Sequence, residues 1–155
     1  MPWSRLQWTH WHATTTTMTD SRPSQPERIP NDWLQRLLAT RNHAYAPYSG
    51  HAVAALVVTE NDETFFSCNV ESAHYKSVCA EAGAISAMVS AGHTRIREVW
   101  VLGPGPDQCP PCGDCRQRIH EFADATTDVY LVDDAGTTLK NYRISELLPE
   151  AFSGP

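Results

Sequence analysis

Hydrophobic and polar positions follow a helical period at the start of the main body of the chain and then an extended one. Residues 29–38 place four apolar side chains at helical spacing, namely Trp33, Leu34, Leu37 and Leu38. Asn31 or Asp32 would cap this helix. Residues 52–59 and 64–70 are apolar runs of strand length, and the polar residues between them predict a hairpin turn. A helix followed by a β-hairpin is therefore expected.

The second half of the body alternates predicted helices with short predicted strands. Helices are expected over residues 79–91, before Gly92, and over residues 112–122. Strands are expected at residues 98–102, 127–132 and 137–142, with a short helical turn at residues 145–148. This order implies an α/β fold, with a mixed sheet and helices on its faces.

Residues 1–28 differ in composition from the rest of the chain. They contain Trp3, Trp8 and Trp11, a run of threonines and a stretch rich in Pro, Ser and Gln, without a helical or strand period. We expect a disordered or loosely docked tail, within which Met18 could equally be the true start. The 155 residues, 41% of them hydrophobic, then leave one domain over residues 29–155 with enough apolar material for a core.

Charge and cysteine content narrow the class of function. Twelve Lys and Arg against eighteen Asp and Glu give a net charge of −6, which disfavours a nucleic-acid polymer as partner. The sequence contains no apolar run of transmembrane length, so no membrane partner is expected, and its N-terminus does not resemble a secretory signal. We therefore expect a cytoplasmic protein whose five cysteines are reduced or bind a metal.

Three of these cysteines fall at predicted helix starts. Cys112 and Cys115 open one helix with the spacing of a metal-binding pair, and Cys79 opens another. Helix N-termini favour thiolates, so two helix starts that point at one spot could bring three thiolates together. On a zinc ion they would leave the fourth position for water, whose pKa the metal lowers to about 7.

A possible proton carrier lies close to these ligands. Glu81 follows Cys79 by two residues, near enough to act as general acid and base without binding the metal. Cys-x-Glu combined with Pro-Cys-x-x-Cys is the pattern of zinc-dependent nucleobase deaminases. The cysteines alone leave other readings open, because Cys109 could complete a four-thiolate structural zinc site or an iron–sulfur ligand set. Cys68, in a strand, is interpreted as a small core residue.

The chain resembles the cytidine deaminase family in its small homotetrameric form. The resemblance covers residues 34–152. Its motifs come in family order: Ala44-Tyr-Ala-Pro-Tyr-Ser49, Cys68-Asn-Val-Glu-Ser-Ala73 with Tyr75, Cys79-Ala-Glu81, Pro111-Cys-Gly-Asp-Cys-Arg-Gln117, Glu121-Phe122 and Glu146-Leu-Leu-Pro-Glu-Ala-Phe152. It implies a three-layer α/β/α sandwich with a five-stranded mixed sheet.

The resemblance also implies an activity and a set of site residues. The expected reaction is hydrolytic deamination of cytidine or 2′-deoxycytidine to the uridine product and ammonia, as in pyrimidine salvage. One zinc per subunit would be held by Cys79, Cys112 and Cys115, with Glu81 as proton shuttle and the backbone N–H of Cys112 polarising the developing oxygen.

The substrate would be held by residues of more than one subunit, as the resemblance implies. Asn69 and Glu71 match the pair that binds the ribose 3′-hydroxyl, and the backbone of Ala80 matches the contact to the base amino group. Three further positions match residues that reach a neighbouring subunit's pocket: Ala73, Tyr75 and Phe152. A homotetramer with shared active sites is therefore expected.

Two positions depart from the family pattern. His51 replaces the usual Phe that packs on the base, either as a tolerated stacking residue or as a change of specificity toward a modified cytosine nucleoside or a nucleoside antibiotic. Ala82 replaces a common Arg beside the thiolates, and the sequence does not say where the side chain of Arg116 points. The alternative function outside the enzymes is a zinc-stabilised binding domain without catalytic activity. The intact Glu81 disfavours this alternative.

Overall fold

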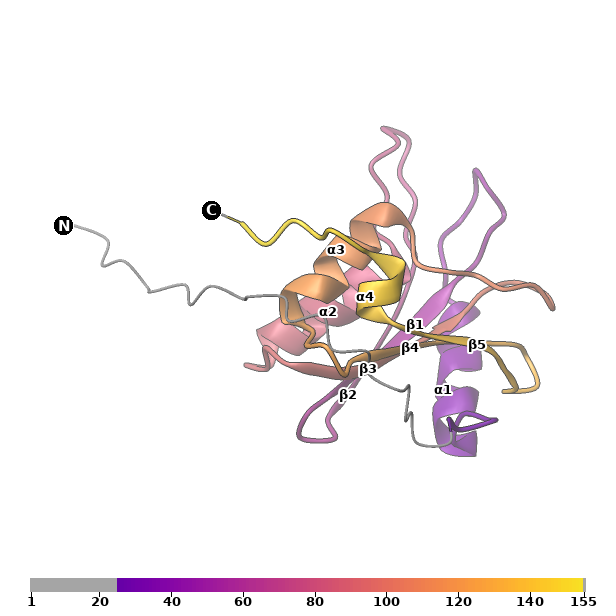
Figure 1. Cartoon of the computed structure of the whole chain (residues 1–155). Coiled ribbons are helices and arrows are strands. Elements are labelled where there is room, and N and C mark those ends of the chain that lie inside the picture. The colour runs from indigo at the N-terminus through magenta and orange to yellow at the C-terminus, as the bar shows by residue number, and fades with distance from the viewer. Residues whose placement is uncertain (1–24, 155) are drawn as a thin grey trace.

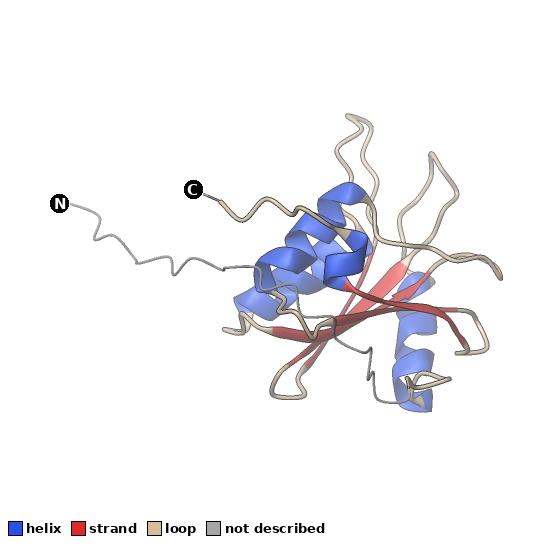
Figure 2. Ribbon diagram, in the orientation of Figure 1, coloured by secondary structure: helices blue, strands red, loops and turns tan. Residues whose placement is uncertain are grey.

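The computed structural model describes residues 25–154, and its elements form three layers (Figures 1 and 2). In chain order they are α1 (Asn31–Arg41), β1 (Ala54–Thr59), β2 (Thr64–Cys68), α2 (Ala80–Ser90), β3 (Ile96–Leu102), α3 (Gly113–Phe122), β4 (Asp128–Val132), β5 (Thr138–Arg143) and α4 (Ile144–Leu147). The strands form one sheet in the order β2-β1-β3-β4-β5, in which only β3 and β4 pair in parallel. Helix α1 covers one face and the other helices cover the opposite face, so the expected sandwich is confirmed.

The central strands are apolar on both sides because each side meets a helical layer. In β1, Leu56 and Val58 belong to the core under α1, whereas Ala55 and Val57 belong to the core under α2 and α3. Every residue of β1 is buried. A strand buried on both faces reads as a continuous apolar run rather than an alternating one, which explains its sequence pattern.

The register of the sheet brings the starts of α2 and α3 together. Ala54, at the beginning of β1, pairs with Cys68 at the end of β2 and with Leu102 at the end of β3. The strands that lead into α2 and α3 therefore end at the same edge of the sheet. The loops before β1, α2 and α3 project from that edge in Figure 1.

Several boundaries differ from the sequence-based expectation. Strand β3 starts at Ile96, two residues earlier than expected, and β2 ends at Cys68 because Val70 leaves the ladder to bridge Val78 instead. The N-cap position of α1 is Pro30, not Asn31 or Asp32, and no side chain caps this helix.

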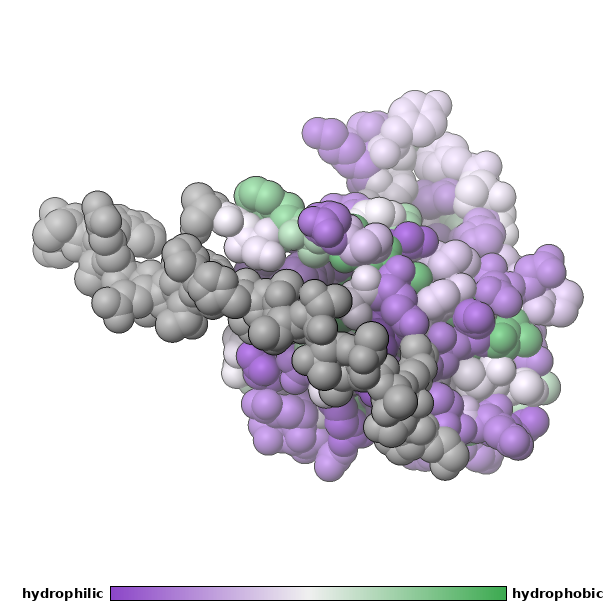
Figure 3. Space-filling view, viewed as in Figure 1, coloured by the Kyte–Doolittle hydropathy of each residue, from purple (hydrophilic) through white to green (hydrophobic). Residues whose placement is uncertain are grey.

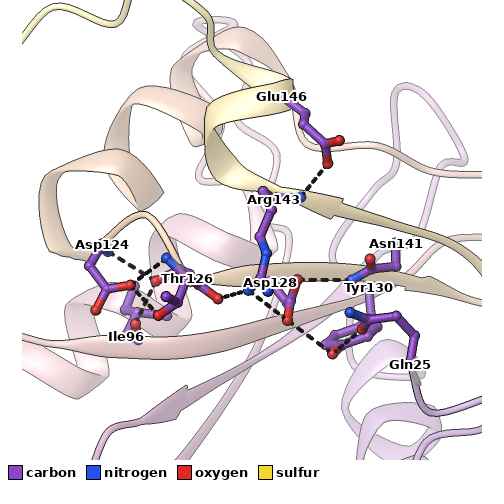
Figure 4. A network of polar contacts seen from close by, with 10 residues as sticks. Gln25, Ile96, Asp124, Thr126, Asp128, Tyr130, Asn141, Arg143 and Glu146 are labelled. Atoms are coloured by element: carbon purple, nitrogen blue, oxygen red, sulfur yellow. Dashed lines mark hydrogen bonds and ion pairs between the residues drawn. The ribbon is translucent and has the colours of Figure 1, made fainter. Parts of the chain in front are cut away.

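The segment that enters α1 is tied to β4 and β5. Most of the predicted tail, residues 1–24, lies outside the described residues, but residues 25–28 run beside β5, where Thr138 N donates to Glu27 O at 2.8 Å. The Tyr130 hydroxyl donates to Gln25 Oε1 at 2.8 Å (Figure 4). In the same network Asp128 forms a 3.1 Å ion pair with Arg143, so the segment shares one polar cluster with both strands.

The coloured residues on the face drawn in Figure 3 are mostly polar. In the face drawn in Figure 3, hydrophobic residues form small separate patches. Among residues 25–154, no helix has the length and apolar character needed to cross a membrane.

Helix α2 approaches β2 closely at Gly83. A Cβ atom at this position would lie 3.0 Å from the Cβ of Ser67 and closer still to its Oγ. A side chain at position 83 would therefore force the helix or the strand to move.

We expect Gly83→Ala to lower the free energy of unfolding by about 1–3 kcal/mol, as overpacking does. This loss would outweigh the gain of about 1 kcal/mol that alanine brings to a helix interior. Urea denaturation measures the difference. Adding Ser67→Gly should recover most of it, whereas the helical control Gly113→Ala, which meets nothing within 4 Å, should not destabilise the fold. A fully stable Gly83→Ala protein would contradict this account.

Candidate metal centre and active site

Three thiols converge where α2 and α3 begin. Cys79 and Cys112 occupy the N-cap positions of the two helices, and Cys115 lies one turn into α3, fully buried. Their Sγ atoms all lie within 4.8 Å of one another, and those of Cys79 and Cys112 are 3.8 Å apart. The structure thus brings together the three cysteines that the sequence analysis grouped.

The spacing of these sulfurs suits a tetrahedral zinc ion. Two sulfurs bound to one zinc at the usual Zn–S distance of about 2.3 Å lie about 3.8 Å apart. Within the described part of the chain, this is the one group of three or more His, Cys, Asp or Glu side chains close enough to share an ion. Cys109 is not part of it, so the geometry does not form the four-thiolate cluster that the sequence left open.

Two of the three thiols, Cys79 and Cys115, hold their protons strongly in the absence of a cation. Burial raises the pKa of the Cys79 thiol to about 11 and raises the pKa of Cys115 further, where the charge of Glu81 adds to the effect. Burial and repulsion between the sulfurs thus oppose ionisation at helix N-termini, which themselves favour thiolates. Metal ions bind deprotonated thiols, so the cluster requires a cation to ionise.

Glu81 lies against the sulfur cluster. It belongs to the first turn of α2 and is only 4% exposed. The thiol of Cys115 donates a hydrogen bond to Glu81 Oε2 at 3.3 Å, and burial raises the pKa of the carboxyl group. A buried carboxyl group with a raised pKa beside a metal site is a typical proton carrier.

A cavity of about 190 Å³ opens beside these groups. It is lined by His51, Val53, Asn69, Cys79, Ala80, Glu81, Cys109, Pro110 and Cys112. Three of the residues assigned to substrate from the sequence, His51, Asn69 and Ala80, therefore face the same space as Glu81 and two of the thiols.

Asn69 and Glu71 hold the loop that carries His51. Glu71 accepts hydrogen bonds from the backbone N–H groups of Tyr48 (2.9 Å) and Ser49 (3.2 Å) and from the Ser49 hydroxyl, which lower the pKa of the carboxyl group, the hydroxyl contributing most. Asn69 accepts from Val53 N and donates to His51 O, both at 2.9 Å. The sequence analysis missed this role, although the Pro and Gly residues mark a loop, and the backbone groups of a loop need hydrogen-bond partners.

The residues expected at a neighbouring subunit's pocket do not line the cavity of this chain. Tyr75 is 89% exposed and Phe152 is 70% exposed, and Ala73 is also exposed. They lie on the surface, where another chain could reach them.

The two departures from the family pattern are placed differently. Ala82 is half-buried in α2. Arg116 donates from Nε to Pro111 O at 2.8 Å and from Nη1 to Leu147 O at 3.0 Å, so its guanidinium braces the turn ahead of Cys112. His51 lies at the cavity wall with its Nε2 at 3.6 Å from the Sγ of Cys109, a contact that no sequence pattern indicates.

Comparison with known proteins agrees with this site. Residues 28–132 match the family model of the cytidine and deoxycytidylate deaminase zinc-binding region. The chain is 34% identical over 128 residues to a cytidine deaminase of Mycoplasma genitalium and 36% identical over 129 residues to that of Mycoplasma pneumoniae. These alignments cover 81% of this chain and 97% and 96% of the relatives.

Solved structures of cytidine deaminases share the fold. The crystal structure of the enzyme from Burkholderia pseudomallei aligns with a TM-score of 0.72 at 34% identity, over 80% of this chain and 100% of that one. The enzyme from Mycobacterium tuberculosis aligns with a TM-score of 0.68 at 28% identity, over 79% of this chain and 98% of that one. On the strength of the matched region and of these relatives, the chain belongs to the cytidine deaminase family.

Proposed function

We propose that the chain is a zinc-dependent deaminase that hydrolyses cytidine and 2′-deoxycytidine to the corresponding uridine and ammonia. The observation that supports it best is the Glu81 carboxyl group, buried against three clustered thiols and facing a cavity. One zinc ion per subunit would be held by Cys79, Cys112 and Cys115. The names of the relatives support the same substrate class.

The reaction needs a nucleophile at C4 of the base and a carrier for several protons. When bound, zinc would supply a Lewis acid that lets water act as a nucleophile near neutral pH. Glu81 would accept one proton from the attacking water and deliver it to N3 of the base. It would then accept the remaining proton from the new hydroxyl group on C4 and deliver it to the amino group, which leaves as ammonia. Its place at the boundary of the sulfur cluster and the cavity supports both its acid and its base role.

Backbone and side-chain groups around the cavity would orient the nucleoside. The N–H of Cys112 precedes the first turn of α3 and would stabilise the developing negative oxygen, while the backbone of Ala80 would meet the base amino group. Asn69 and Glu71 would bind the ribose 3′-hydroxyl. A carboxylate has about four acceptor sites and the loop uses three of those on Glu71, so one is left for a hydroxyl.

Assembly and cellular role complete the proposal. A homotetramer would bring Ala73, Tyr75 and Phe152 of one chain to the pocket of another, and their exposure is consistent with that placement. The net charge of −6 supports a free nucleoside rather than a nucleic-acid polymer as substrate. All five cysteines are free, as in proteins of the reducing cytosol, where the reaction would serve pyrimidine salvage.

Metal dependence is tested by following the ultraviolet absorbance of cytidine during incubation with the full chain. We expect conversion to uridine that stops after chelation and returns with added zinc, because the thiols need a cation to ionise. The chelated protein should also unfold at a lower temperature. Full activity in a protein shown to be metal-free would refute zinc dependence, and no conversion of cytidine by zinc-loaded protein would refute the activity.

Replacement of Glu81 tests its part in proton transfer. Glu81→Gln should lower kcat by at least about 10²–10⁴-fold, the contribution of a general acid–base group, while zinc content stays unchanged. Metal analysis by mass spectrometry separates this result from loss of the ion. Glu60→Gln, at an exposed hairpin turn, provides a matched control that should keep normal kcat.

Mixing subunits of two variants tests whether each active site is shared between chains. Glu81→Gln and Phe152→Ala proteins should each have low activity and a mass in solution four times the 17.2 kDa of the chain. Unfolding and refolding them together should restore part of the activity, because some pockets then combine an intact Glu81 with an intact Phe152 from another chain. A monomeric protein, or mixtures no more active than their parts, would rule out the shared arrangement.

A further inference from the structure

His51 and Cys109 touch across the wall of the cavity. His51 lies in the loop before β1 and Cys109 in the loop before α3, and the imidazole Nε2 is 3.6 Å from the thiol Sγ. Both residues line the cavity, but neither belongs to the sulfur cluster. The proposed deamination assigns no task to this contact.

The backbone of His51 is fixed from both sides. Its N–H donates to Ser49 Oγ at 3.0 Å, and its carbonyl accepts from Asn69 Nδ2 at 2.9 Å. The Ser49 hydroxyl in turn donates to the carboxylate of Glu71. The imidazole is therefore carried by a loop segment that is already ordered before any ligand enters.

The side chain of Cys109 packs closely against Gly103, where no side chain is in its way. A Cβ atom at Gly103 would lie 2.9 Å from the Sγ of Cys109 and closer still to its Cβ. Cys109 fills this space and packs, half-buried, against the core under α2 and α3. Separate constraints thus hold the backbone that carries the imidazole and the side chain that carries the thiol.

The contact uses one ring nitrogen of His51. The Cys109 thiol, whose pKa is raised by burial, can donate to Nε2 or accept from it, because a thiol is both a weak donor and a weak acceptor. The other ring nitrogen, Nδ1, makes no hydrogen bond to any residue between 25 and 154, so it is available to a polar group of a ligand.

The remaining wall offers a base substituent little else to bind. Val53, Ala80 and Pro110 present apolar side chains, and the Asn69 amide already bonds the loop backbone. In a cytosine nucleoside that reacts at C4, with N3 at Glu81 and the sugar on N1, the free edge next to the reacting carbon is C5. A polar group on C5 would therefore find its hydrogen-bond partner in the side chain of His51.

We propose that the His51–Cys109 pair determines specificity, favouring cytosine nucleosides with a hydrogen-bonding substituent at C5 over those with a methyl group there. The proposal rests on the proposed deaminase function and extends it to a class of substrate. His51 touches the substituent, and Cys109 acts through His51 as a positioning residue.

The kinetic test compares kcat/KM for 5-hydroxymethylcytidine, 5-methylcytidine and cytidine, using zinc-loaded full-length chain. The ratio of kcat/KM for the hydroxymethyl substrate to kcat/KM for the methyl substrate should fall about three- to tenfold in His51→Phe, which keeps an aromatic ring but loses the hydrogen-bonding nitrogen. Cys109→Val should lower the ratio in the same direction, and Cys109→Ser, which keeps a donor at the position, should restore most of it. His43→Phe, an exposed histidine outside the cavity, is the matched control and should leave the ratio unchanged.

A binding measurement separates this proposal from the proposed activity. Calorimetry on the same proteins should show tighter binding of 5-hydroxymethyluridine than of 5-methyluridine, with the preference lost in His51→Phe. If the protein deaminates no cytidine but keeps this preference, the proposed function fails and the pair retains its role. If cytidine is deaminated and His51→Phe leaves both ratios unchanged, or weakens all nucleosides equally, the specificity proposal is overturned.

Discussion

The meeting of two helix N-termini at one edge of the sheet is the constraint on which the site depends. Strands β2 and β3 end at that edge because both pair with the first residue of β1, so the helices that follow them start side by side. Burial at this junction keeps the Cys79 and Cys115 thiols protonated. A bound cation would offset this effect, and the fold supplies the position of the sulfurs.

The polar groups around the cavity are largely arranged before a ligand arrives. Asn69 and Glu71 use their side chains on the loop ahead of β1, and Arg116 braces the turn ahead of Cys112 with two backbone carbonyls. Ordering these segments during folding removes an entropic cost from substrate binding. Accurate placement of a reacting base needs such support from residues that do not react.

The sequence was sufficient to predict those parts of the fold and of the site that depend on residues close together in the chain. The helix starts at Cys79 and Cys112 and the nearby Glu81 were visible as spacing, and the order of apolar runs predicted a mixed sheet with helices on its faces. Contacts between distant segments were not visible. His51 and Cys109 are 58 positions apart, and no pattern in either loop announces that Gly103 leaves room for the thiol. The early end of β2 likewise depends on a bridge from Val70 to Val78.

The sulfur ligands and the wall of the cavity belong to different kinds of structure. The thiols stand at or within the first turn of α2 and α3, whose positions follow from the sheet, whereas His51 and Cys109 stand in loops. A substitution in either loop can alter the wall without shifting the helix that holds a ligand. Such a scaffold lets related genes diverge in the nucleosides they accept while inheriting the same hydrolytic chemistry, one loop residue at a time.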